Sequence, residues 1–273
     1  MYKLNFGISS WCYPWSLGVV KGPQPPKKMT WLELLNKAIE FEVNLVQFAD
    51  NLPLEKLSGA ELDELKSFAD NNEISLEVGT KGIEEEHLLK MLDIAVQLNS
   101  PILRVLPAFF GSSAIMKEVE VKINRVLPLF EKEGIVMVLE NTEAFKAEEY
   151  VGLIQRVNHP NFQMCVDLAN ALGIMEGPEF VLEKLIPYCS NFHFKDVVVK
   201  RSETVMGFTI DGTPAGQGDL SLPWIIEQLE LNHKSPSIII ELWPTWTNSI
   251  EETKILEENW TRESVAYMKS IMD

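Results

Sequence analysis

Eight short apolar segments alternate with eight longer amphipathic segments along this chain of 273 residues. The short segments are five or six residues long and rich in β-branched and aromatic residues, which is typical of buried strands. They are predicted at residues 6–11, 45–49, 74–78, 102–106, 135–140, 162–167, 192–196 and 238–242. A regular alternation of strands with helices predicts an α/β fold built on parallel strands.

The amphipathic segments predict helices at residues 30–42, 58–72, 84–98, 114–132, 146–157, 178–188, 221–231 and 251–271. Two of them open with a capping box, Thr30 with Glu33 and Ser58 with Glu61. Eight strand–helix pairs in a chain of this length predict a (β/α)8 TIM barrel. A doubly wound open sheet is the alternative, but the chain has no glycine-rich dinucleotide loop to favour it. The chain also lacks a linker, so we expect residues 1–273 to form a single domain.

Composition narrows the classes of partner. The chain carries 24 Lys and Arg residues against 40 Asp and Glu residues, a formal net charge of −16. Nucleic acids and anionic membranes bind basic faces, so we expect neither as a partner. The start of the chain resembles no signal peptide, and no segment is long enough to span a membrane. The three cysteines show no patterned spacing, so we expect a reduced, cytoplasmic protein.

Four of the predicted strands each deliver one metal-type ligand: Glu140, Asp167, His193 and Glu241. In a barrel the carboxyl ends of the strands meet at one face, where active sites lie. A buried carboxylate is costly unless something pairs with it, so the four side chains together predict a shared cation. Three oxygens and one imidazole suit Mn²⁺ or Mg²⁺, with Co²⁺ or Zn²⁺ as alternatives. Taken singly, each carboxylate is also compatible with a salt bridge and His193 with a satisfied core histidine.

A family resemblance rests on the segments Leu139-Glu140-Asn141, Val166-Asp167, His193-x-Lys195-Asp196, Gly216-x-Gly218 and Glu241-Leu242. The pattern resembles the xylose-isomerase-like TIM-barrel superfamily of sugar isomerases and epimerases. The resemblance implies that Glu140, Asp167, His193 and Glu241 bind one divalent metal ion. It also implies that Glu140 and Glu241 are catalytic, because the matching glutamates flank the substrate and move protons.

One position departs from the pattern of the family. Many members carry a second histidine three residues after the aspartate, where it touches the substrate. This chain has Asn170 there. An amide can hydrogen-bond a substrate hydroxyl but cannot act as an acid or base. We therefore expect Asn170 to bind substrate without transferring a proton.

Three cationic side chains are predicted near the centre. Lys195 lies two residues after His193 and so shares its strand face, pointing either at a substrate oxyanion or into an ion pair with Glu140 or Asp167. Arg104 interrupts an apolar strand, and a buried arginine needs a carboxylate, either from a ligand or, as we favour, from the protein. Arg201 lies in the long glycine-rich segment 197–220, interpreted as an active-site lid in which Arg201 or Lys195 grips an acidic group. The alternative for Arg201 is a solvated surface position.

Aromatic residues follow the first and the eighth predicted strands, which are neighbours in a closed barrel. They are Trp11, Tyr13, Trp15, Trp243 and Trp246. Trp11 and Trp243 are candidates to pack on the apolar face of a sugar ring. The same rings can instead cap the barrel or form the interface of a homo-oligomer.

The leading hypothesis is a divalent-metal-dependent sugar isomerase or epimerase that acts on a keto-sugar or keto-sugar acid through an enediolate. The first alternative is a metal-dependent decarboxylase of a 3-oxo sugar acid such as 3-oxo-isoapionate, because the segment from Met206 to Gly218 resembles that subgroup. A dehydratase on the same barrel is a third enzyme class. A non-catalytic sugar- or metal-binding barrel is the alternative outside the enzymes, although a binder needs no pair of proton-transferring glutamates.

Overall fold

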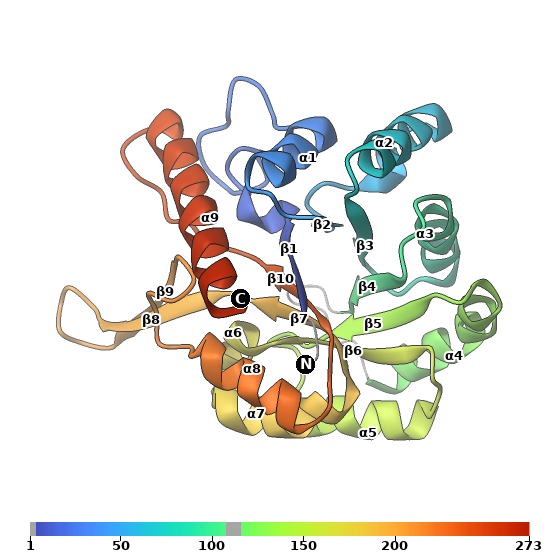
Figure 1. Cartoon of the computed structure of the whole chain (residues 1–273). Coiled ribbons are helices and arrows are strands. Elements are labelled where there is room, and N and C mark those ends of the chain that lie inside the picture. Colours follow the sequence, from blue (N-terminus) through green and yellow to red (C-terminus); the bar gives the residue numbers. More distant parts are fainter. Residues whose placement is uncertain (1–3, 108–115, 273) are drawn as a thin grey trace.

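The structure is a computed structural model that describes residues 4–107 and 116–272. Eight parallel strands close into a barrel in the order β1-β10-β7-β6-β5-β4-β3-β2 (Figure 1). The barrel strands are β1 Asn5–Ser9, β2 Leu45–Phe48, β3 Ser75–Lys81, β4 Ile102–Leu106, β5 Val136–Glu140, β6 Phe162–Asp167, β7 Cys189–Phe194 and β10 Ser237–Ile240. The predicted (β/α)8 TIM barrel is therefore confirmed.

The helices cover the outside of the barrel (Figure 1). They are α1 Trp31–Glu40, α2 Gly59–Asn71, α3 Glu85–Gln97, α4 Met116–Glu133, α5 Ala147–Val157, α6 Leu168–Ala171, α7 Pro178–Leu185, α8 Leu222–Leu231 and α9 Ile250–Met272. Both predicted capping boxes are formed, at the start of α1 and of α2. The first two residues of the predicted helix 114–132 lie outside the described residues. The short helix α6 was not predicted, because four residues are too few to show a helical period.

Several strands end earlier than the sequence predicts, and these ends set the position of the site. The first strand stops at Ser9, whose Oγ accepts a hydrogen bond of 3.1 Å from the backbone N–H of Trp11 and so opens a turn of 3-10 helix at Ser10–Cys12. Strand β7 stops at Phe194, and β10 stops at Ile240. Lys195 and Glu241 therefore lie just beyond their strands, at the rim of the barrel.

The segment 197–220, predicted as an irregular lid, contains an antiparallel hairpin. Its strands are β8 Asp196–Arg201 and β9 Phe208–Thr213, which pair in register from Asp196 with Thr213 to Arg201 with Phe208. The run of three valines after Asp196 favours a strand over a loop. The hairpin extends away from the barrel (left in Figure 1).

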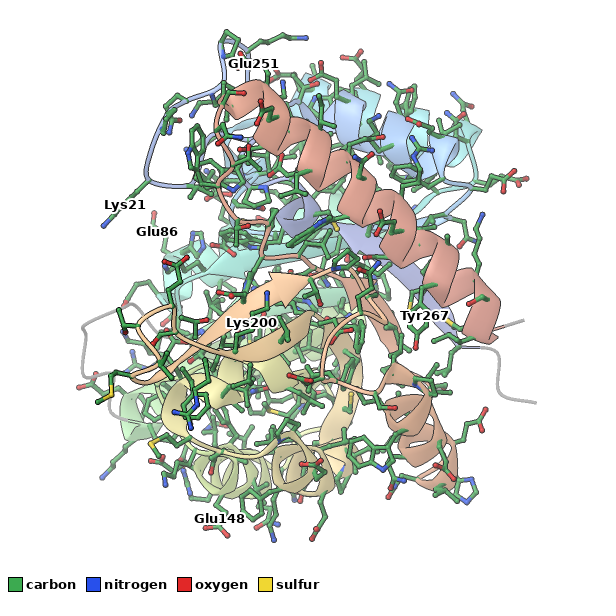
Figure 2. All side chains as sticks on the ribbon, turned by 90° about the vertical axis from the view of Figure 1, so that its left-hand side faces the viewer. Lys21, Glu86, Glu148, Lys200, Glu251 and Tyr267 are labelled. Carbon is green, nitrogen blue, oxygen red and sulfur yellow. The ribbon has the colours of Figure 1, made fainter. Side chains whose placement is uncertain are left out.

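Asp196 anchors the chain where it returns from the hairpin. Its Oδ2 accepts backbone hydrogen bonds from Gly216 at 2.8 Å and Gly218 at 2.9 Å, and its Oδ1 accepts one from Leu220 at 3.2 Å. A Cβ on Gly218 would lie 2.2 Å from Asp196 Oδ1, so only glycine fits there. Gly216 has φ +83° and packs against Tyr267. Tyr267 belongs to α9 (Figure 2). The Gly-x-Gly motif thus has a structural explanation: it lets the backbone approach the aspartate.

The outer surface accounts for the negative charge of the chain. Glu86, Glu148 and Glu251 belong to different helices and are all exposed (Figure 2). Exposed carboxylates of this kind are solvated and bear on solubility more than on the fold.

We predict that Gly218→Ala lowers the free energy of unfolding by about 1–3 kcal/mol, because the added methyl group collides with Asp196 and the carbonyl of Val197. Urea unfolding followed by circular dichroism measures the change. Gly59→Ala is the matched control, since nothing lies within 4 Å of a Cβ at that position in the first turn of α2. Equal stability of the Gly218 variant and the parent would contradict the anchoring role of Asp196.

Candidate metal centre and active site

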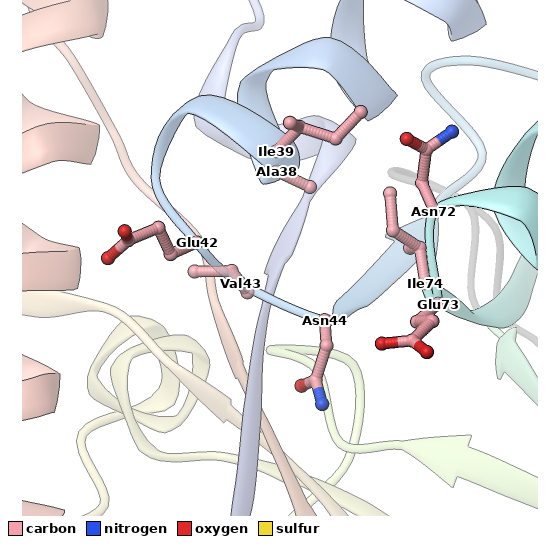
Figure 3. A pocket seen from close by; sticks show the side chains of 8 residues that line it. All are labelled: Ala38, Ile39, Glu42, Val43, Asn44, Asn72, Glu73 and Ile74. Atoms are coloured by element: carbon pink, nitrogen blue, oxygen red, sulfur yellow. The ribbon is translucent and has the colours of Figure 1, made fainter.

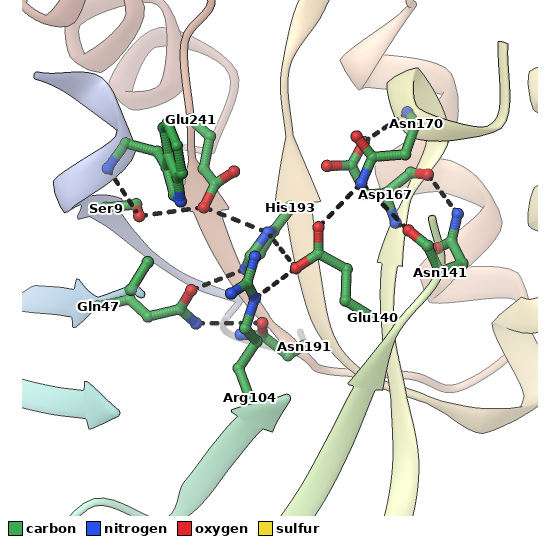
Figure 4. A network of polar contacts seen from close by, with 12 residues as sticks. Ser9, Gln47, Arg104, Glu140, Asn141, Asp167, Asn170, Asn191, His193 and Glu241 are labelled. Carbon is green, nitrogen blue, oxygen red and sulfur yellow. Dashed lines mark hydrogen bonds and ion pairs between the residues drawn. The ribbon is translucent and has the colours of Figure 1, made fainter. Parts of the chain in front are cut away.

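The four predicted metal ligands converge at the mouth of the barrel (Figure 4). His193 Nδ1 lies 3.4 Å from Glu140 Oε2 and 3.4 Å from Glu241 Oε1. Asp167, His193 and Glu241 each offer a ligand atom within 4.8 Å of the other two. All four side chains are buried. The structure therefore brings together the complete set that the sequence proposed.

The register of the strands explains this convergence. Asp167 at the end of β6 pairs with His193 on β7, and His193 pairs with Ile239 of β10, two residues before Glu241. All eight strands are parallel, so their carboxyl ends and the side chains placed there meet at one face. A second group of nearby ligand atoms, from Glu140, Cys165 and His193, includes a thiol that the sequence analysis did not select.

Arg104 supports Glu140 from the neighbouring strand. Its Nε forms an ion pair with Glu140 Oε2, and its Nη1 lies 2.9 Å from Asp50 Oδ1. Burial alone would raise the pKa of the Glu140 carboxyl, but Arg104 and His193 lower that pKa to about 2. Gly79 on β3 lies close to the backbone of the neighbouring strand, since a Cβ there would lie 3.1 Å from the carbonyl oxygen of Phe48. The prediction that Arg104 has carboxylate partners within the protein is confirmed.

Lys195 bridges two of the other ligands. Its Nζ lies 2.6 Å from Asp167 Oδ2 and 3.0 Å from Glu241 Oε2. Burial would raise the pKa of Glu241, but the positive charges of His193 and Lys195 hold it well below the ordinary value. The Trp243 ring lies over the same ammonium, 5.3 Å from Nζ to the ring centroid, and 37% of Trp243 is exposed. Lys195 thus forms the ion pair with Asp167 that was one of its two predicted alternatives. The Trp243 ring covers this ion pair.

The amide side chains of Asn170 and Asn141 hold two of the candidate ligands, Glu140 and Asp167, by hydrogen bonds. Asn170 donates from Nδ2 to Glu140 Oε1 at 2.9 Å and to the carbonyl of Asn141 at 3.1 Å. Asn141 exchanges two hydrogen bonds with the backbone of Asp167, at 2.7 and 2.8 Å. Asn170 is therefore already committed to Glu140, and its Oδ1, 3.5 Å from Lys195 Nζ, faces the cation.

Arg201 is the predicted site residue that the structure does not bring to the centre. It is exposed at the outer end of β8, and its guanidinium carbon lies 4.3 Å from the centroid of the Phe208 ring. Arg201 lies five positions after Asp196 along β8, a span of about 17 Å. The structure therefore matches the surface alternative for Arg201.

The aromatic residues at the rim divide into two groups. Tyr13 and Trp15 are buried: the Tyr13 hydroxyl donates to Glu258 at 3.3 Å and Trp15 Nε1 donates to the Pro244 carbonyl at 2.8 Å. Their role is to close the barrel against α9. Trp11 is half-buried with its Nε1 3.5 Å from Asp50 Oδ1, the carboxylate that also holds Arg104. Trp11 and Trp243 thus lie beside the cationic partners of the centre.

The sequence analysis missed the polar layer beneath the centre, formed by Gln47, Glu77 and Asn191. All three side chains are buried, and Gln47 Oε1 lies 2.8 Å from His193 Nε2. It also missed Ser9, whose hydroxyl donates to Glu241 Oε1 at 3.1 Å. Gln47 and Glu77 could have been recognised from the sequence, because each is a polar residue within an apolar strand, as in Leu-Val-Gln47-Phe and Leu-Glu77-Val.

These residues fit a divalent metal ion. Among the described residues, His193 Nδ1 has no hydrogen-bond partner although it is buried, which leaves a nitrogen in position to ligate. The ion-pair network contains four carboxylates, Asp50, Glu140, Asp167 and Glu241, and two fixed cations, Arg104 and Lys195. A ligating histidine is neutral. With His193 neutral, four negative charges less two positive charges leave two, which a divalent ion would balance. Carboxylate oxygens with one imidazole are donors that suit Mn²⁺ or Mg²⁺.

A surface cavity of about 260 Å³ lies at the other end of the barrel (Figure 3). Its lining includes Asn44, just before β2, and Ile74, just before β3. These positions mark the amino-terminal ends of the strands, so the cavity is separate from the metal-type ligands. Within the described parts of the chain, no helix combines the length and apolar character needed to cross a membrane.

Comparisons with known proteins place this geometry in a family. Residues 36–271 match the family model of the xylose isomerase-like TIM barrel, so the chain belongs to that family. The chain is 29% identical over 265 residues to 3-oxo-isoapionate decarboxylase from Pectobacterium atrosepticum, covering 97% of this chain and 95% of that enzyme.

Two solved structures illustrate the shared fold. D-psicose 3-epimerase from Clostridium cellulolyticum, solved with D-tagatose, has a TM-score of 0.76 at 13% identity, covering 99% of this chain and 100% of that one. A xylose isomerase-like TIM barrel protein from Mycobacterium smegmatis, in complex with magnesium, has a TM-score of 0.71 at 14% identity, covering 100% of both chains.

We predict that Arg104→Met destabilises the metal-free protein by about 3–5 kcal/mol, because it leaves Glu140 without its buried cationic partner. Chemical unfolding in the presence of a chelator measures the change. Arg156→Met serves as the control, since it breaks only the exposed pair with Glu120 and should cost at most about 1 kcal/mol. Equal effects of the two substitutions on the free energy of unfolding would show that the buried Arg104–Glu140 pair stabilises the protein no more than an exposed pair does.

Proposed function

We propose that this protein is a divalent-metal-dependent decarboxylase of a 3-oxo sugar acid. The observation that carries the proposal is the convergence of Glu140, Asp167, His193 and Glu241 around a buried imidazole nitrogen without a hydrogen-bond partner. The relative that aligns with nearly the whole chain, a 3-oxo-isoapionate decarboxylase, supports the substrate class. Mn²⁺ or Mg²⁺ is the ion that the donor set favours.

A bound divalent ion would supply the Lewis acid that polarises the ketone of the substrate. The residues of the chain supply orientation and charge. Lys195, buried between Asp167 and Glu241 and in contact with Trp243, is the cation placed to pair with the substrate carboxylate. The two Trp rings, Trp11 and Trp243, flank this opening and offer apolar faces to the carbon skeleton.

The proposed reaction breaks the carbon–carbon bond between the carboxylate and the carbon next to the ketone. CO₂ leaves, and the electron pair of that bond passes into the ketone as an enolate. A proton from the ammonium of Lys195 then returns to the carbon, and the lysine regains a proton from solvent. The sum of the steps exchanges CO₂ for one proton and needs no oxidant or reductant.

The contacts of the two glutamates favour this reaction over isomerisation, which the sequence alone ranks first. Removal of a proton from carbon requires a sufficiently strong base at the substrate, and contacts with cations and hydrogen-bond donors weaken a carboxylate as a base. Glu140 gives one oxygen to Arg104 and the other to Asn170. Glu241 gives one oxygen to Ser9 and the other to Lys195. Decarboxylation requires neither glutamate to leave these partners.

Isomerisation or epimerisation of a keto-sugar is the second candidate. It is supported by the position of Glu140 and Glu241 on either side of His193, each 3.4 Å from Nδ1. D-psicose 3-epimerase shares the fold along the full chain. In this case one glutamate would take the proton next to the ketone and the other would return it.

We predict that the protein stripped of metal by a chelator is inactive and that Mn²⁺ or Mg²⁺ restores CO₂ release from 3-oxo sugar acids. The same incubations with a panel of ketoses in D₂O test the second candidate, since enolisation introduces deuterium at carbon. Activity that survives exhaustive chelation would refute the metal-dependent mechanism. Neither CO₂ release nor deuterium incorporation across the panel would indicate a sugar- or metal-binding barrel without catalysis.

We predict that Glu241→Gln folds but loses turnover by at least about 100-fold, because an amide is a poor ligand for a hard cation and leaves Lys195 with one carboxylate fewer. Steady-state kinetics at saturating Mn²⁺ measure the loss, with the thermal midpoint as the test of folding. Glu251→Gln, an exposed substitution at the start of α9, is the control. Turnover within a few-fold of the parent would exclude Glu241 from the reaction.

A further inference from the structure

Gln47 and Asn191 lie next to the proposed metal centre (Figure 4), and Glu77 accepts hydrogen bonds from both to complete the polar layer. The layer is joined to the centre by one contact, between Gln47 Oε1 and His193 Nε2 at 2.8 Å. The imidazole thus touches the layer with one ring nitrogen and faces Glu140 and Glu241 with the other. The role of Gln47 follows from which of its two amide atoms meets the ring.

The hydrogen bonds of the layer determine how the Gln47 amide is turned. Gln47 Nε2 donates to Glu77 Oε2 at 2.9 Å and to Asn191 Oδ1 at 3.2 Å. The Asn191 amide is fixed in turn, because its Nδ2 donates to Glu77 Oε2 at 3.1 Å and to Ser237 Oγ at 2.8 Å. Turning Gln47 over would point its oxygen at two acceptors in a dry interior, which is costly. The oxygen of Gln47 therefore faces His193.

An acceptor at Nε2 requires that this nitrogen carry the proton. A neutral imidazole has one N–H and one bare nitrogen, and the hydrogen bond made by one nitrogen decides the state of the other. With the proton on Nε2, the lone pair of Nδ1 points between Glu140 and Glu241. That nitrogen is the buried atom without a hydrogen-bond partner.

We propose that Gln47 is a positioning residue that holds His193 in the Nε2–H tautomer, so that Nδ1 presents its lone pair to the divalent ion. Glu77 and Asn191 hold Gln47 in the required orientation. This role rests on the proposed metal centre but concerns a different residue: Gln47 lies on β2, two strands of the barrel away from β10 and the Glu241 that follows it. Partners that orient a ligating histidine typically affect metal affinity by about 10- to 100-fold.

The test measures binding of Mn²⁺ alone by titration calorimetry. Gln47→Met keeps the length of the side chain and removes its carbonyl acceptor. We expect the variant to fold and its Kd for Mn²⁺ to rise by about 10- to 100-fold. Gln155→Met is the matched control: it makes the same exchange on the outside of the barrel, where the exposed Gln155 Nε2 donates to the Tyr188 hydroxyl at 3.1 Å. Its Kd should stay at the wild-type value.

A second measurement reads the tautomer without any variant. Long-range ¹H–¹⁵N correlation spectra of the Mg²⁺-loaded protein, labelled at its four histidines, show which nitrogen of His193 carries the proton. A proton on Nε2 is expected. A proton on Nδ1, or wild-type Mn²⁺ affinity in Gln47→Met, overturns the role of Gln47. Failure of the wild-type protein to bind Mn²⁺ or Mg²⁺ instead overturns the metal centre itself, so the two failures are distinguishable.

Discussion

The need to neutralise buried carboxylates governs the structure around the mouth of the barrel. Glu140, Asp167 and Glu241 are each at most 1% exposed, and unpaired anions at such depth would be unstable. Arg104 meets this need in part for Glu140, and Lys195 meets it in part for Asp167 and Glu241.

The same requirement extends into the barrel. Interiors of this fold are usually packed with layers of branched apolar side chains. Here Gln47, Glu77 and Asn191 occupy the layer below the ligands and satisfy one another by hydrogen bonds. A buried polar network is stable only when its members are paired, and then it also fixes orientation. This part of the core therefore contains a hydrogen-bonded polar layer in contact with His193, where apolar packing is usual.

The fold and the convergence of the four candidate ligands were predictable from the sequence because both rest on local patterns. Apolar segments of strand length gave the eight strands, and the residues at their ends gave Glu140, Asp167, His193 and Glu241. The partners were harder to predict. Gln47 and Ser9 reach the centre from strands far away in sequence, and only ring closure brings them close. Arg201 resembled a binding residue because its segment resembled a loop, whereas the pairing of β8 with β9 carries it outward.

The hydrogen bonds that Asp196 accepts at the base of the hairpin affect where related chains can differ in length. Asp196 gathers the amides of Gly216, Gly218 and Leu220 at the barrel end, so the two bases of the hairpin are tied together. Residues 202–207, at the tip beyond β8 and β9, lie outside this tie. Insertions or deletions at the tip would change the separation of His193 and Glu241 in sequence while leaving their distance in space unaltered. We therefore expect length variation at the hairpin tip, where it leaves the geometry of the candidate ligands unchanged.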